Sequence, residues 1–220
     1  MATSPAKENI LKRIREALSN PVPLPFPHSE GNSSVYVKSE EEPMVVFAEE
    51  FTKLQGKFAF CTCEEDLQIQ LGNLIQQKNW SKVYCREQEL KVMLKSIAIE
   101  DYNDLPSCEV SVTGCEFLVA RTGTMVLSAA QESGRTTSVY APIHICIAYT
   151  NQLLYDVKDA LVALKEKYGN VGFPSFTTFA SGPSRTADIE KTLVTGVHGP
   201  KEVFCFLVEK NKNKNDNNLS

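Results

Sequence analysis

The residues between Thr178 and Val208 include those best suited to bind a ligand. Two Gly-Pro pairs, Gly182-Pro183 and Gly199-Pro200, enclose a polar segment, and an apolar run follows it. The segment carries the polar side chains of Ser184, Arg185, Thr186, Asp188, Glu190 and His198, among others. Because Gly and Pro fix turn geometry, and binding residues gather on loops held by a rigid scaffold, the pattern indicates a binding loop. An ordinary connection with solvated side chains is the alternative.

The chemistry that this segment suggests is anion binding. Ser184 is expected to lead into a short helix with Asp188 and Glu190 in its first turn. The free N–H groups of that turn would bind an anion, with Arg185 as a clamp. The acids would otherwise only complement the helix dipole. His198, beside Gly199, is a candidate proton-transfer group near neutral pH.

A second candidate site is the run Arg121-Thr122-Gly123-Thr124, which is continued by Ser128 and a polar loop at 131–137. Glycine lets a backbone approach a ligand closely, and the threonine hydroxyls can donate hydrogen bonds to its oxygens. Arg121 favours an anion such as a carboxylate or a phosphate. The glycine spacing and the missing lysine exclude a P-loop, and a β-bulge or a hairpin turn is the alternative.

The remaining histidines and cysteines predict no metal site and no cofactor. The chain has three histidines, and His144 falls in an expected strand, where a buried imidazole with a structural role is favoured. It has seven cysteines, and Cys61-Thr62-Cys63 lacks the second pair that would complete a zinc site. The spacings also differ from those of iron–sulfur ligands, so we expect reduced structural thiols. No catalytic motif for a known reaction occurs.

These segments must be positioned by alternating strands and helices. Apolar runs predict strands at 57–63, 82–85, 108–112, 116–120, 124–128, 143–149, 176–180 and 203–208. Helical periodicity predicts helices at 6–18, 41–55, 64–78, 87–97 and 155–168. Alternation of this kind predicts an α/β fold, a three-layer α/β/α sandwich around a mostly parallel sheet. We expect the residues after Ala120 and after Ala180 to leave carboxyl ends of strands and to converge on one pocket.

Length and composition limit the number of domains and the classes of partner that the chain can have. Its 220 residues fit one core with extensions: an N-terminal helix and Pro-rich strap at 1–40, an α/β domain at 41–209, and a disordered tail at 210–220. The net charge of -4 argues against nucleic-acid binding. No run approaches the length of a membrane span and no signal peptide is visible, so we expect a cytoplasmic protein.

The run GPSRTADIEKTLVTGVHGP resembles the C-terminal signature of the lactate-utilization protein C family, which is built on the LUD domain. The resemblance extends to Ala120–Thr124 and Pro142–Ile145, and it covers the chain from about Phe58 to Val208. In that family an acidic residue often precedes the Thr-Gly-Thr, where this chain has Arg121.

The resemblance implies a fold like that of glucosamine-6-phosphate deaminase (NagB), ribose-5-phosphate isomerase (RpiA) and CoA transferase. It also implies a non-redox component of a system that oxidises L-lactate to pyruvate, working with separate iron–sulfur subunits. A free-standing enzyme, or a binding module for a small carboxylate or phosphorylated metabolite, is the alternative.

Overall fold

The computed structural model describes residues 5–19, 39–189 and 192–210. Contacts within the chain divide it into two units, Met1–Lys38 and Ser39–Ser220. The first unit contributes helix α1 (Pro5–Ser19), as predicted. The predicted Pro-rich strap at 21–27 and the tail after Lys210 lie outside the described residues. Over the part of the chain that is described, no helix has the length and apolar character needed to cross a bilayer.

The second unit holds the remaining elements. Its helices are α2 (Pro43–Lys53), α3 (Glu64–Lys78), α4 (Gln88–Ser96), α5 (Thr137–Tyr140) and α6 (Val157–Tyr168), with short 3-10 helices at Leu105–Ser107, Ala120–Thr122 and Thr150–Gln152. Its strands are β1 (Lys57–Cys61), β2 (Val83–Cys85), β3 (Val110–Thr113), β4 (Phe117–Val119), β5 (Thr124–Ser128), β6 (Ile143–Tyr149), β7 (Leu153–Leu154), β8 (Thr177–Ala180), β9 (Arg185–Ile189), β10 (Thr192–Thr195) and β11 (Glu202–Val208).

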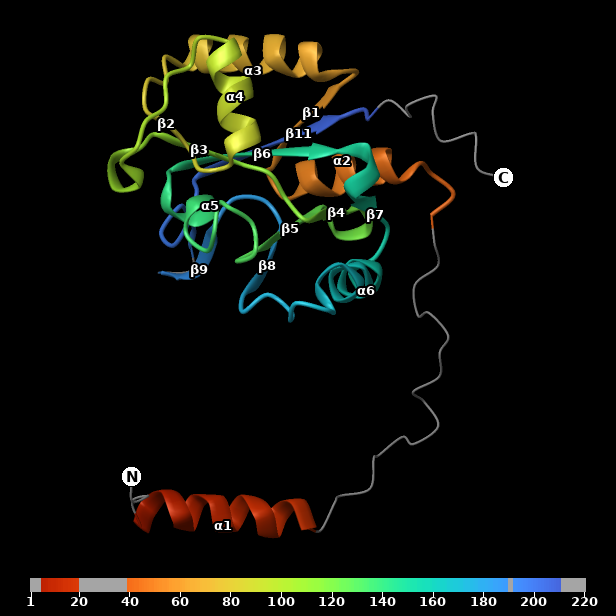
Figure 1. Cartoon of the computed structure of the whole chain (residues 1–220), viewed down its shortest axis with the longest axis vertical. Coiled ribbons are helices and arrows are strands. Elements are labelled where there is room, and N and C mark those ends of the chain that lie inside the picture. Colours follow the sequence, from red (N-terminus) through yellow and green to blue (C-terminus); the bar gives the residue numbers. More distant parts are fainter. Residues whose placement is uncertain (1–4, 20–38, 190–191, 211–220) are drawn as a thin grey trace. The chain divides into compact units, whose positions relative to one another are not determined.

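A parallel five-stranded sheet forms the centre of this unit, in the order β1-β11-β6-β3-β2. Helices α3 and α4 cover one of its faces, and α2 lies on the other (Figure 1). The predicted fold class, an α/β fold with a mostly parallel central sheet and helices on both sides, is therefore confirmed.

Side chains alternate between the two faces of each central strand, which creates two apolar cores. On β6 and β11, Ile145, Ile147, Phe204 and Phe206 pack with the inner sides of α3 and α4. Their neighbours along the same strands pack on the opposite face with Phe47 and Phe51 of α2. Burial on both faces explains why these strands are almost continuously apolar.

A second sheet, in the order β7-β4-β5-β8, packs beyond the α2 face of the central sheet. The predicted strand at 176–180 belongs here as β8, antiparallel to β5. Strands β4 and β5 also pair antiparallel, because the turn between them is too short for a parallel crossover. One face of this sheet joins the α2 core, and Val119 and Val126 on the other pack against Ala160 and Leu164 of α6.

The helix predicted after Ser184 is wrong. Residues Arg185–Ile189 form β9, which pairs antiparallel with β10 as a hairpin. The β-branched residues Thr186, Ile189, Thr192, Val194 and Thr195 favour strands, and this preference outweighs the helix-like placement of the acids. The helix-terminus argument for anion binding at Arg185 therefore does not apply.

Two glycine turns meet the C-terminal end of α2. Gly123 has a φ of 54°, and a Cβ there would overlap the backbone of Glu50 and Phe51, with Phe51 Cα 2.8 Å away. Gly182 has a φ of 80°, and its Cβ would lie 2.6 Å from the Leu54 carbonyl oxygen. Both positions need glycine for the left-handed conformation and for the close approach.

We expect Gly123→Ala to lower the free energy of unfolding by about 2 kcal/mol or more, because it adds backbone strain and a collision with α2. Gly72→Ala is the matched control, since Gly72 lies within α3 and a Cβ there meets no atom within 4 Å. That change should raise stability by about 0.5 to 1 kcal/mol. Urea denaturation measures both, and equal effects of the two substitutions would contradict the packing described.

Candidate functional site

A large pocket opens at the carboxyl edge of the central sheet, and we call it the carboxyl-edge pocket. Residues that end or follow all five parallel strands line it: Glu64 after β1, Glu87 after β2, Gly114 after β3, Tyr149 at the end of β6, and Lys210 after β11. Its volume is about 880 Å³, within the range of pockets for metabolites and cofactors. Ligand sites of open parallel sheets lie at this edge.

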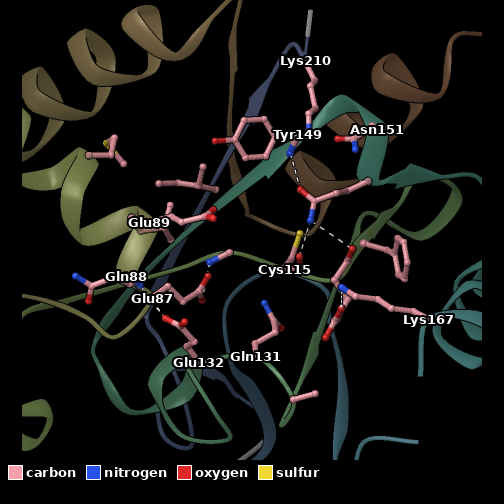
Figure 2. A pocket seen from close by; sticks show the side chains of 18 of the residues that line it. Glu87, Gln88, Glu89, Cys115, Gln131, Glu132, Tyr149, Asn151, Lys167 and Lys210 are labelled. Carbon is pink, nitrogen blue, oxygen red and sulfur yellow. Dashed lines mark hydrogen bonds and ion pairs between the residues drawn. The ribbon is translucent and has the colours of Figure 1, made fainter. Parts of the chain in front are cut away.

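Glu87 follows β2, the outermost strand at one end of the central sheet, and its side chain lines the pocket (Figure 2). Its Oε1 accepts a hydrogen bond of 2.9 Å from the Gly114 backbone N–H. A Cβ at position 114 would lie 2.8 Å from Oε2, so the carboxylate sits where glycine leaves room for it. Burial raises the pKa of Glu87, and the nearby carboxylates of Glu132 and Glu116 raise it further. Glu87 therefore holds its proton to a higher pH than an ordinary glutamate, as a proton-transfer group does.

Glu116 anchors the opposite wall of the pocket. It is 2% exposed, and its carboxylate accepts hydrogen bonds from Ser128, from the Tyr168 hydroxyl at 2.8 Å and from Lys167 Nζ at 2.7 Å. Burial, followed by the hydrogen bond to Glu116, raises the pKa of Tyr168, so its phenol stays protonated. The buried carboxylate thus fixes two side chains from the last turn of α6 at the pocket wall.

The lining of the pocket is predominantly acidic. Five glutamates contribute to it, namely Glu64, Glu87, Glu89, Glu116 and Glu132, and its two cationic side chains are those of Lys167 and Lys210. Glutamine, asparagine and tyrosine side chains supply further hydrogen-bonding groups. Such a lining suits a ligand rich in hydroxyl groups or carrying a positive charge, and proton transfer is the chemistry that Glu87 can supply.

The thirteen residues predicted as ligand-binding from the sequence do not line this pocket. The prediction missed Glu87 and the Gly114-Cys115-Glu116 run. A usable signal existed, because both follow predicted parallel strands, and carboxyl ends of such strands form the crevice. The strands before Arg121 and Ser181 belong instead to the second sheet.

The predicted segment Arg121–Thr124 forms a structural junction. Arg121 Nε lies 2.8 Å from Asp156 Oδ2, and the hydrogen bond from Arg121 lowers the pKa of Asp156. Thr124 Oγ1 lies 2.8 Å from the Thr122 hydroxyl and 2.6 Å from the Ser181 hydroxyl. The structure therefore brings the two predicted segments together, next to Gly123 and Gly182.

Part of the predicted segment between the two Gly-Pro pairs lines a smaller hollow at the other edge of the central sheet, which we call the amino-edge cavity. Gly182, Ser184, His198 and Gly199 border it. Pro183 is buried, Thr186 is half-buried and Arg185 is exposed. The side chains of Asp188 and Glu190 lie outside the described residues. Ligand binding by the thirteen predicted residues stays a prediction.

The cysteines serve packing. Cys61, Cys85, Cys108, Cys115, Cys146 and Cys205 are buried, and Cys63 is half-buried. Burial raises the pKa of Cys61 to about 11 and that of Cys85 to about 12, which keeps both thiols protonated. Within the described ranges, no group of three or more His, Cys, Asp or Glu side chains could hold a metal ion.

We expect Glu87→Gln to stabilise the protein at neutral pH. The raised pKa means that the charged form of Glu87 is less favourable in the folded state, a penalty absent below the usual glutamate pKa and complete above the folded one. Glutamine keeps an acceptor for the Gly114 N–H without the charge.

The gain in unfolding free energy should therefore appear at pH 7 to 8 and vanish near pH 4, about the pKa of an unperturbed glutamate. Denaturation at several pH values measures it. Glu89→Gln, an exposed change on the same rim, should alter stability by less than about 0.5 kcal/mol. A gain at pH 4 equal to that at pH 8 would show that the charge of Glu87 is not the cause.

Comparisons with known proteins agree with this architecture. The family model of the LUD domain matches residues 32–208. A crystal structure of a DUF162 family protein from Deinococcus radiodurans superposes with a TM-score of 0.55 at 18% identity, covering 76% of this chain and 96% of that one. At that identity the likeness concerns the fold alone.

Sequence relatives cover part of the chain. Lactate utilization protein C of Bacillus licheniformis is 33% identical over 112 residues, or 50% of this chain and 46% of that protein. Lactate utilization protein C of Bacillus subtilis is 32% identical over 110 residues, with the same coverage. An uncharacterized protein of Neisseria meningitidis serogroup B is 36% identical over 100 residues, or 46% of this chain and 42% of that protein.

The chain spans about half the length of the curated relatives it matches. The LUD domain model, in contrast, extends over residues 32–208, from before α2 to the end of β11. The chain therefore belongs to the LUD domain family.

Proposed function

We propose that this chain is a non-redox component of a cytoplasmic L-lactate utilization system, which oxidises lactate to pyruvate with the help of separate iron–sulfur subunits. The observation that carries the proposal is the LUD domain at 32–208 together with relatives named lactate utilization protein C. Other features of the structure support two parts of the proposal: that the iron–sulfur subunits are separate chains, and that this chain contacts them.

The positions of the thiols support a division of labour between chains. Iron–sulfur clusters are held by groups of thiolates. Cys61 and Cys85 are buried and protonated, and Cys115, Cys146 and Cys205 belong to one apolar core. Thiols placed this way fit packing better than ligation, so partner chains would supply the clusters.

Helix α1 supports the existence of a protein partner. Ile10, Ile14 and Leu18 are spaced by four residues and lie on one face of this helix. A single helix cannot bury such a face by itself, so it needs a surface to pack against. A docking helix for a partner subunit is part of the proposal.

We expect gentle purification from native cells to retrieve cysteine-rich partners with this chain. Ile14→Asp should abolish their recovery, because a buried unpaired charge at the centre of the apolar face costs several kcal/mol. Lys12→Asp, on the opposite face of α1, is the control and should retain the partners.

Mass spectrometry and visible absorbance of the purified material measure the result. A wild-type chain recovered without cysteine-rich partners would contradict the proposal. Equal recovery with Ile14→Asp would contradict only the assignment of α1.

The carboxyl-edge pocket favours a second candidate function: a free-standing enzyme, or a binding module, for a small metabolite. The pocket has the volume for a phosphorylated sugar or a similar molecule, and Lys167 and Lys210 could meet an anionic group. The raised pKa of Glu87 provides a proton-transfer group within it. Fold alone is a poor guide to activity, so this candidate depends on the pocket.

A thermal-shift panel of sugars, sugar phosphates, nucleotides, polyamines, lactate and pyruvate separates the two candidates. A ligand at about 100 times its dissociation constant adds about 2.7 kcal/mol of stability. A free-standing function predicts a shift with a sugar, nucleotide or polyamine that Glu87→Gln changes and that Glu166→Gln, an exposed change outside the pocket lining, preserves. Turnover of that compound would identify an enzyme, and binding without turnover would identify a binding module. No shift with these compounds would contradict a free-standing role.

A further inference from the structure

The amino-edge cavity is a second hollow, separate from the carboxyl-edge pocket. It lies beside the starts of β6 and β11, with Met125 and Leu127 of β5 in its wall and the segments flanking the β9–β10 hairpin along its border. Its volume is about 130 Å³. A protein cavity of about 150 Å³ holds benzene, so this one accommodates a molecule of about six non-hydrogen atoms.

Backbone hydrogen bonds hold the hairpin side of the cavity in place. Ser184 N donates to the Pro200 carbonyl at 2.9 Å, and Gly196 N donates to the Ser184 carbonyl at 2.9 Å. Both segments that border the cavity are therefore tied to each other. A wall fixed in this way gives the cavity a defined shape before a ligand arrives, which lowers the cost of binding.

His144 supplies the buried polar group of the cavity. It is 1% exposed, and its Nε2 lies 2.8 Å from the Thr113 hydroxyl. Burial lowers the pKa of His144 to about 4, so the ring is neutral at physiological pH. Among the residues that the structure describes, Thr113 is the hydrogen-bond partner of this side chain, and it uses one of the two ring nitrogens. The other nitrogen is available to a hydroxyl or carbonyl group in the cavity.

A positive charge, that of Lys201, lies outside the cavity in an adjoining surface hollow. His198, Gly199 and Val139 line both the cavity and a surface hollow of about 420 Å³, which Lys201 also lines. The Lys201 stem lies against Gly196. The described residues that line the inner cavity supply imidazole, serine hydroxyl and apolar groups, and none of these residues is a carboxylate, a lysine or an arginine. The surroundings thus change from neutral and apolar at His144 to positively charged at Lys201.

We propose that the amino-edge cavity binds a short 2-hydroxy or 2-oxo acid, with its hydroxyl or carbonyl oxygen at His144 and its carboxylate at His198 and Lys201. Lactate has six non-hydrogen atoms, which match the cavity volume, and its carboxylate would lie at His198, where the cavity adjoins the hollow that Lys201 lines. The inference rests on the proposed function, to which it adds a site and a substrate class. It also accounts for four of the residues selected from the sequence, namely Gly182, Ser184, His198 and Gly199.

Histidine-selective ¹⁵N labelling tests this inference directly, because the chain has three histidines. Sodium L-lactate is titrated into the 220-residue chain at pH 6, and the imidazole signals are followed. His28 and His198 are assigned by their loss in His28→Ala and His198→Ala, which leaves the remaining signal to His144. We expect lactate to shift the signals of His144 and His198, and pyruvate to do the same. Lactamide, which has the size of lactate without its charge, should bind at least about tenfold more weakly, since a charged hydrogen bond is worth about that factor. Phenyllactate keeps the charge but exceeds the cavity volume, so it should also bind more weakly than lactate.

Variants locate the site. His198→Ala and Lys201→Met change exposed side chains, and each should weaken lactate binding by about tenfold. Lys210→Met removes a cation from the carboxyl-edge pocket and should leave binding unchanged. Lactate binding that is lost in Lys210→Met and kept in His198→Ala would overturn the inference and move the site to the carboxyl edge.

An absence of any shift up to high millimolar lactate would also overturn the inference. It would leave the proposed function to be judged by the recovery of partner subunits. Recovery of no partners, together with lactate-dependent shifts of His144 and His198, would overturn the multisubunit role and keep the site.

Discussion

The structure depends on the contact between the C-terminal end of α2 and two glycine turns. Gly123 lies against the backbone of Glu50 and Phe51, and Gly182 lies against the Leu54 carbonyl. The hydroxyls of Thr124 and Ser181, each next to one of these glycines, are 2.6 Å apart. This junction ties the second sheet to the helix that covers the central sheet. It also fixes the point at which the chain leaves β8 and enters the hairpin over the amino-edge cavity.

The two edges of the central sheet differ in electrostatic character because different residues flank its strands. At the carboxyl edge, glutamates follow β1, β2 and β3, and the pocket there is acidic. At the amino edge, the inner lining is formed by imidazole, hydroxyl and apolar groups, with Lys201 outside. The first environment raises the pKa of a carboxyl group, and the second keeps a buried imidazole neutral. Each edge therefore offers a different chemical environment to a ligand.

Sequence patterns were sufficient for most of the helices and for the strands of the central sheet, but not for α5, β7 and the β9–β10 hairpin. The helix at Glu64–Lys78 and the strands at Thr124–Ser128 and Ile143–Tyr149 have their predicted bounds. Alternation of strands and helices predicted the parallel sheet, since a crossover helix is what parallel neighbours require. The assignment of β8 to a second sheet could not be predicted, because an apolar run indicates a strand but not the strand with which it pairs.

The site was harder to predict for related reasons. Asp188 and Glu190 after Ser184 resemble the acidic first turn of a helix. The β-branched residues around them and the pairing of β9 with β10 favour a strand instead. Glu87 follows a strand of three residues and stands at the start of a predicted helix, so its place after the strand was the one signal in its sequence surroundings. Its raised pKa depends on burial and on the carboxylates of Glu132 and Glu116, which are distant in sequence and come close only when the strands align.

The central claim is that His144 and the segments flanking the β9–β10 hairpin together form a site for a small hydroxy acid at the amino edge of the sheet. A crystal structure of the full chain grown with sodium L-lactate tests it most directly. The account predicts a lactate molecule in the amino-edge cavity, with its hydroxyl within hydrogen-bond distance of His144 and its carboxylate facing His198 and Lys201. Lactate bound instead among Glu87, Lys167 and Lys210, with solvent in the amino-edge cavity, would contradict it.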